Sequence, residues 1–148
     1  MKTYIFKIKL LDNKKIVREI EVLEDASLYK LAGAIINAYD FDFDHAFGFF
    51  SAITTDWPAL AKSEKMYELF ADMENQGIEP TGAKSVRKTK IGEVWKNIGD
   101  KMMMLFDYGD DWRFVVELIG FGKNNTKTKY PRVLKSVGDS PDQYPEYE

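Results

Sequence analysis

Three aspartates, Asp107, Asp110 and Asp111, lie within five residues of one another. Carboxylate oxygens are the ligands that hard divalent cations such as Mg²⁺ prefer, so this spacing suggests a cation site. Three carboxylates so close together repel one another unless a positive group, such as Arg18 or Arg113, lies among them. The same stretch contains a glycine flanked by aspartates, which is typical of tight hairpin turns, so a purely structural turn is the alternative.

His45 is the only histidine in the chain, which excludes a metal site built from several histidines. An imidazole oriented by a carboxylate titrates near neutral pH and can serve as a general acid or base. Strand alternation would point the preceding Asp44 to the opposite face, so we expect an aspartate of the later cluster to be the partner. The candidate catalytic residues are His45, Asp107, Asp110 and Asp111, and the alternative is a structural histidine packed among aromatic rings.

Two predicted hairpins frame these residues. Residues 3–11 and 16–23 alternate between apolar and polar side chains, and turn-forming residues separate them, which predicts an antiparallel pair. Residues 101–108 and 112–120 form a second pair of predicted strands, with the aspartate cluster as their connecting turn.

Helical signals lie between the two hairpins. Ser27 is a favourable N-cap for a helix ending near residue 40, because apolar residues follow it at helical spacing. The remaining predicted elements are a short aromatic strand over residues 46–53, a loop at Trp57-Pro58, a helix over 63–75 and a short helix over 91–96.

This order predicts an α+β fold. We expect a mixed or mostly antiparallel sheet of about five or six strands with two main helices. The opening hairpin followed by a helix is similar to a β-grasp topology, a likeness that says nothing about function. Residues 1–148 should form one domain, with an elaboration at 57–88 and an irregular tail from residue 123.

Composition narrows the function classes. The chain has no cysteine, which excludes disulfides, zinc ribbons and iron–sulfur ligation and fits a cytoplasmic location. No apolar run approaches the length of a membrane span, so we expect no membrane partner. The net charge of −3 gives no general attraction to nucleic acid, although two local basic clusters are present. These clusters are Lys84, Arg87, Lys88 and Lys90, and Lys123, Lys127, Lys129 and Arg132.

Four stretches of the chain resemble the plasmid pRiA4b ORF-3-like family. The strongest is Phe-Asp-Tyr-Gly-Asp-Asp-Trp over residues 106–112, close to the family motif Tyr-Asp-Phe-Gly-Asp-Asp-Trp. The others are Ile-Val-Arg-Glu-Ile at 16–20, the helix from Ser27 with Asp-His-Ala-Phe at 44–47, and Tyr-Pro-Arg at 130–132 followed by Gln143-Tyr144. Val17 stands where the family has an aromatic residue, and Glu19 where it has a second arginine.

The resemblance implies an α+β fold and, in some members, an association with plasmids and mobile elements, but no established reaction. Within the matching stretches, Arg18, Tyr108, Trp112 and Arg132 are the candidate binding residues.

Two functions therefore stay open. The first is an interaction or regulatory module that holds an unknown protein or nucleic-acid partner. The second is an enzyme that acts on a phosphorylated or nucleic-acid substrate, either by acid–base chemistry or with a divalent cation as cofactor.

Overall fold

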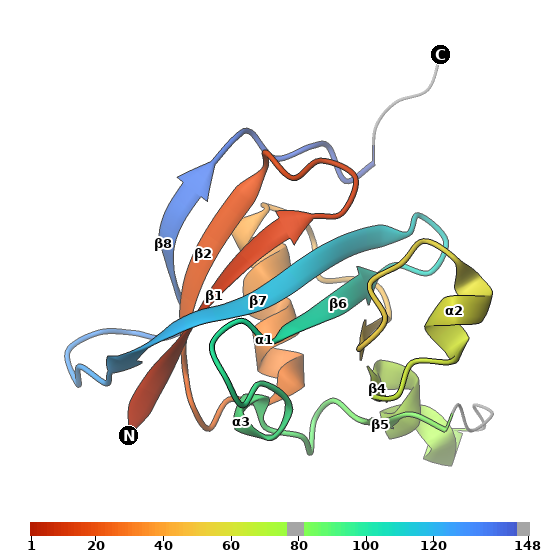
Figure 1. Ribbon diagram of the computed structural model, residues 1–148, viewed down its shortest axis with the longest axis horizontal. Helices are drawn as coiled ribbons and strands as arrows, with labels where there is room; N and C mark the ends of the chain where they lie inside the picture. The colour runs from red at the N-terminus through yellow and green to blue at the C-terminus, as the bar shows by residue number, and fades with distance from the viewer. Residues whose placement is uncertain (77–81, 145–148) are drawn as a thin grey trace.

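The computed structural model describes residues 1–76 and 82–144 (Figure 1). Within them, eight strands form one sheet in the order β5-β4-β3-β6-β7-β1-β2-β8. The strands are β1 (Lys2–Leu10), β2 (Val17–Leu23), β3 (Phe47–Phe50), β4 (Met66–Glu68), β5 (Lys84–Ser85), β6 (Lys101–Phe106), β7 (Trp112–Lys123) and β8 (Arg132–Val137). Only β4 and β5 pair in parallel among these neighbours. The predicted α+β class is confirmed, but five or six strands was too few.

One long helix, α1 (Leu28–Ala38), lies behind the sheet in the view of Figure 1. Its N-cap is the predicted Ser27, whose hydroxyl oxygen accepts the Lys30 amide at 3.1 Å. The alternate residues Phe6, Ile8 and Leu10 of β1 are buried in the same core as the apolar face of this helix. The first hairpin and the first helix therefore form as the apolar pattern predicts.

The second predicted main helix, over residues 63–75, is helical only in its second half. The structure places β4 there, followed by the 3₁₀ helix η1 (Leu69–Gln76). Over only three residues, the apolar spacing of a strand is indistinguishable from that of the first turn of a helix. The sequence pattern therefore could not distinguish β4 from the start of a helix. A short helix, α2 (Trp57–Ala61), lies instead in the predicted loop, with Asp56 as its N-cap.

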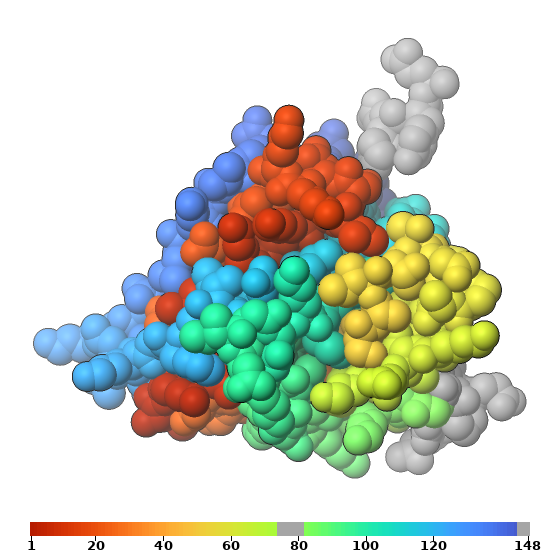
Figure 2. Space-filling view, in the orientation of Figure 1, coloured from red at the N-terminus to blue at the C-terminus, as the bar shows by residue number. Residues whose placement is uncertain are grey.

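The sheet is covered on its second face at one end only. Phe50, Met103 and Leu105 point away from α1 and bury against Leu60 of α2. Farther along, β1 and β7 reach the surface facing the viewer in Figure 2, between the α2 segment in yellow and the blue C-terminal segment. One face of the sheet is therefore the main core, and the other is partly open.

The predicted irregular tail contains a strand. β7 extends to Lys123, and β8 pairs antiparallel with β2 at the edge of the sheet. Every residue of β8 is exposed, so no apolar alternation marks it in the sequence. Residues 77–81 of the predicted elaboration and 145–148 of the predicted tail lie outside the described residues.

A third helix, α3 (Ile91–Val94), precedes β6 as expected. In the part of the chain that the structure describes, no helix is long and apolar enough to cross a membrane.

Candidate functional site

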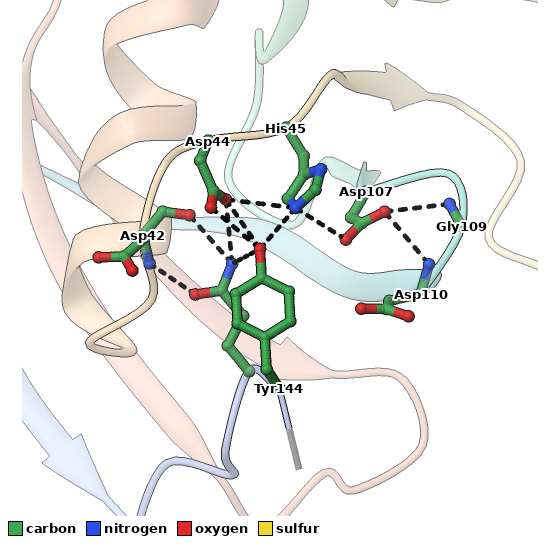
Figure 3. Close-up of polar contacts among 8 residues, drawn as sticks. Asp42, Asp44, His45, Asp107, Gly109, Asp110 and Tyr144 are labelled. Atoms are coloured by element: carbon green, nitrogen blue, oxygen red, sulfur yellow. Dashed lines mark hydrogen bonds and ion pairs between the residues drawn. The ribbon is translucent and has the colours of Figure 1, made fainter. Parts of the chain in front are cut away.

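His45 lies in the loop between α1 and β3, next to Asp44 (Figure 3). The Nε2 atom of His45 is 3.4 Å from Oδ1 of Asp44. The expectation that these two side chains point to opposite faces is wrong, because the strand begins only at Phe47 and its alternation does not reach them.

Asp107 approaches His45 from the turn after β6. Its backbone is left-handed, with φ at 64°, and its Oδ1 accepts the amides of Gly109 at 3.1 Å and Asp110 at 3.2 Å. These bonds leave Oδ2 facing Nε2 of His45 at a distance of 3.3 Å. The Asp107 side chain therefore holds the turn, as the structural alternative expected, and also contacts the imidazole.

The C-terminal segment completes this cluster. The hydroxyl of Tyr144 shares a 2.5 Å hydrogen bond with Nε2 of His45 and lies 3.0 Å from Oδ2 of Asp44. The Gln143 amide donates to the Asp42 carbonyl at 3.0 Å, and its oxygen accepts the Asp42 amide at 2.7 Å. Figure 3 shows the Tyr144 side chain pointing from the C-terminal segment toward the loop that carries His45.

The site is acidic, and its carboxylates affect the titration of the Tyr144 hydroxyl. Partial desolvation, together with the hydrogen bond to the Asp44 carboxylate and the nearby charges of Asp107 and Asp110, raises the pKa of the Tyr144 phenol to about 12. Deprotonating this hydroxyl would put a further negative charge among carboxylates, so the folded protein keeps it protonated.

An open hollow of 340 Å³ adjoins His45, and aromatic and aliphatic side chains predominate in its lining. Its lining includes Tyr29, Phe43, Leu69, Phe70 and Met73. The His45 ring itself stands edge-on to Phe106 with centroids 5.9 Å apart. A polar group at the rim of an apolar hollow is a common arrangement in small-molecule and peptide sites.

The three predicted metal-ligand aspartates do not converge. Asp110 is exposed, and Oδ2 of Asp111 lies 3.9 Å from Arg113 NH2. Among the described residues, no group of three or more acidic, histidine or cysteine side chains is placed to hold a metal ion. The cation proposed from the sequence therefore has no set of three such ligands in the part of the chain that the structure describes.

Arg18 has a structural role rather than contacting the aspartates. Its guanidinium is buried and donates to the carbonyls of Ala38 at 3.0 Å and Val137 at 3.1 Å, and to the Ser140 hydroxyl at 2.7 Å. It thereby ties the end of α1 to β8. Arg132 is likewise occupied, because both Nε and NH2 lie 2.7 Å from the buried Glu21 carboxylate.

The other two candidate binding residues are packed against neighbouring rings. The Tyr108 hydroxyl donates to Glu68 at 2.6 Å, while Trp112 packs against Phe41 with ring centroids 4.8 Å apart. Within residues 1–76 and 82–144, no hydrogen bond, ion pair or ring contact joins the four predicted binding residues to one another. They do not form a common site.

Sequence reasoning missed Asp42, Gln143 and Tyr144 as members of the cluster. Gln143 and Tyr144 lie in the C-terminal stretch that resembles the family. This resemblance was the one feature of the sequence that could have drawn attention to them. That signal identified a segment but gave no reason to bring it to His45.

The comparisons with known proteins agree with the resemblance. The family profile for plasmid pRiA4b ORF-3-like proteins matches residues 2–144. The chain belongs to the plasmid pRiA4b ORF-3-like family. No curated protein matches this family member in sequence. Among solved structures, a protein of unknown function from Methanosarcina mazei Go1 superposes with a TM-score of 0.75 at 18% identity, over 96% of this chain and 72% of that one. At that identity, the likeness shows that the pRiA4b ORF-3-like fold is shared and does not extend to function.

Proposed function

We propose that this protein is an interaction module that binds a short extended segment of a partner protein at the His45 site. The observation that carries the proposal is the docking of Gln143 and Tyr144, which lie on the site as a bound peptide would. The Gln143 side chain pairs with both backbone groups of Asp42, and the Tyr144 hydroxyl reaches the Asp44 carboxylate and the His45 imidazole.

The chemistry of this contact suits peptide recognition. The amide of Gln143 matches the donor and acceptor of Asp42 in both directions, a pairing that aspartate or glutamate could not make. A tyrosine hydroxyl that both donates and accepts satisfies Asp44 and His45 together. A partner segment with a Gln-Tyr pair would therefore compete with the chain's own tail. Because the family is named after a plasmid gene product, proteins encoded on mobile elements are the first partners to test.

The test uses the full-length chain with Gln143→Ala and Tyr144→Ala, which frees the site without removing any of the sheet. A fluorescently labelled peptide of residues 139–144, Asp-Ser-Pro-Asp-Gln-Tyr, is titrated and its anisotropy followed. We expect binding to the double variant with Kd below about 1 mM, and weaker binding to the wild type, whose tethered tail competes at an effective concentration in the millimolar range.

Two controls make this result specific. A peptide with phenylalanine in place of tyrosine should bind less well, because it lacks the hydroxyl that meets His45. Adding His45→Ala to the double variant should weaken binding of the tyrosine peptide but leave the affinity for the phenylalanine peptide nearly unchanged. Equal binding of both peptides, or equal binding by wild type and double variant, would contradict the proposal.

A second function, acid–base catalysis on a phosphorylated or nucleic-acid substrate, is favoured by one observation. Nε2 of His45 faces the Asp107 carboxylate at 3.3 Å, beside a hollow large enough for a small substrate. In this role the imidazole would take a proton from a water that attacks phosphorus, the P–O bond to the leaving alcohol or phenol would break, and Asp107 would stabilise the imidazolium that forms.

Bis(p-nitrophenyl) phosphate tests this second function, since its hydrolysis releases coloured nitrophenolate. The double variant with an opened site should release it faster than the same protein carrying His45→Gln. Equal rates in these two proteins would exclude catalysis at His45 on this substrate and leave peptide binding unaffected.

A further inference from the structure

A second hollow, of 340 Å³, lies at the N-terminal end of α1, among segments that are distant in sequence. Its polar and aromatic lining includes Ser27, Lys30, Arg87, Lys90 and Tyr130. Arg87 and Lys90 come from the first basic cluster noted in the sequence, whereas Tyr130 lies beside Arg132 of the second. The fold therefore adds Lys30 and an aromatic ring to one of those clusters.

The backbone around this hollow is fixed. The Leu28 amide donates to the Thr89 carbonyl at 2.9 Å, and the Ile91 amide donates to the Ala26 carbonyl at 2.9 Å. These bonds hold the segment with Arg87 and Lys90 against the first turn of α1. The Arg87 guanidinium in turn lies 4.2 Å from the centre of the Tyr29 ring, which limits its freedom.

Basic side chains outnumber acidic ones in the lining of this hollow. Lys30, Arg87 and Lys90 form no ion pair with any carboxylate of the described residues, and Asp25 is the only acid among the lining residues. The first turn of α1 contains no acidic residue, although the positive end of the helix dipole lies there. An anion is the group that would neutralise this arrangement.

We propose that this hollow binds the phosphate of a nucleotide-type ligand, either free or within a single-stranded nucleic acid. Arg87 offers the planar fork that holds two phosphate oxygens, and Lys30 and Lys90 add point charges. The Ser27 hydroxyl accepts the Lys30 amide and donates to no acceptor among the described residues, which leaves its proton for a phosphate oxygen. The half-buried ring of Tyr130 offers a face for a base.

A second group of lysines provides a matched control. Lys7, Lys9 and Lys101 lie on the open face of the sheet, lining another hollow. Lys7 and Lys101 are cross-strand neighbours of Glu117. These lysines carry the same charge as Lys30, Arg87 and Lys90, but Glu117 lies across the strands from two of them and no helix N-terminus is among the lining residues of their hollow.

The test compares Lys30→Gln/Arg87→Gln/Lys90→Gln with Lys7→Gln/Lys9→Gln/Lys101→Gln, so both proteins lose three positive charges. Binding of a labelled oligothymidylate of about 12 nucleotides is followed by anisotropy at several salt concentrations. Unlabelled ATP and inorganic phosphate serve as competitors, and near-ultraviolet circular dichroism checks that both variants fold.

We expect the first triple variant to bind at least about tenfold more weakly than wild type and to flatten the slope of log K against log salt by roughly 2, as the loss of three phosphate contacts predicts. The control should keep most of the affinity. Competition by ATP at lower concentration than by phosphate would identify a free nucleotide as a ligand. Binding of the oligothymidylate that neither ATP nor phosphate displaces would identify nucleic acid. Equal weakening in both triple variants, or no binding of any of the three probes to wild type, would overturn the proposal.

Discussion

The hydroxyl of Tyr144 lies 2.5 Å from Nε2 of His45, although 99 positions separate the two residues in the chain. This contact brings the C-terminal segment onto the one histidine and beside two carboxylates. The proposed binding function follows from this contact, and the titration of the Tyr144 phenol can be measured directly.

The Tyr144 contact should make stability depend on pH in the alkaline range. Desolvation and the hydrogen bond to Asp44 raise the pKa of its phenol to about 12 in the folded protein, against about 10 for a free tyrosine. The folded state therefore holds the proton more tightly, so the stabilisation is complete below pH of about 10 and is lost as the pH rises through the folded value. Tyr144→Phe should be less stable than wild type at pH 8, as urea denaturation would show.

That difference should shrink as the pH approaches 12. Burial also raises the pKa of Tyr39 and of Tyr108. The wild type and Tyr144→Phe share these residues, so the comparison between the two proteins isolates Tyr144. If the difference in free energy of unfolding between wild type and Tyr144→Phe stayed constant from pH 8 to about pH 12, the Tyr144 hydroxyl would not have a raised pKa in the folded protein.

Asp107 should tolerate asparagine far better than alanine. Its backbone is left-handed, a region that asparagine enters readily, and an asparagine oxygen can still accept the Gly109 and Asp110 amides. We expect Asp107→Asn to lower the free energy of unfolding by about 1 kcal/mol and Asp107→Ala by about 2–4 kcal/mol. Similar losses in urea denaturation would mean that the carboxylate oxygen does not support the turn.

Arg18 should be replaceable by neither leucine nor lysine. Its guanidinium meets the carbonyls of Ala38 and Val137 from one rigid fork, which a lysine ammonium cannot reproduce. Arg18→Leu should cost about 3 kcal/mol, because it leaves several partly buried acceptors without a donor. Hydrogen exchange should also quicken in β8, the strand that Arg18 ties to α1. Lys14→Gln, at an exposed turn, is the control that should change neither quantity.

Asp110→Asn should change stability by less than about 0.5 kcal/mol, because the side chain is exposed and only the backbone amide bonds to Asp107. This differs from the behaviour of a metal ligand. Melting curves with chelator and with Mg²⁺, Mn²⁺, Ca²⁺ or Zn²⁺ should coincide for wild type and variant. A rise in melting temperature with one cation, lost in Asp110→Asn, would restore the acidic turn as a metal site through mass action.

The chain's local patterns were sufficient for several elements. Alternation in residues 3–11 and 16–23, and Ser27 before an apolar helical face, predicted the first hairpin and α1, which the structure contains. The aspartate-glycine stretch predicted the turn between β6 and β7. These features depend on backbone preferences and on residues near one another in sequence, so the sequence alone determines them.

Only the tertiary structure decided where β8 and Tyr144 lie. β8 is exposed on both faces, so pairing with β2 rather than burial makes it a strand, and no pattern in its own residues announces that pairing. Tyr144 meets His45 because the return of the chain along β8 carries the C-terminal segment across the sheet edge to the loop before β3. Contacts between residues so far apart depend on the packing of the whole sheet, and that is why the sequence pointed to His45 and Asp107 but not to the residue that covers them.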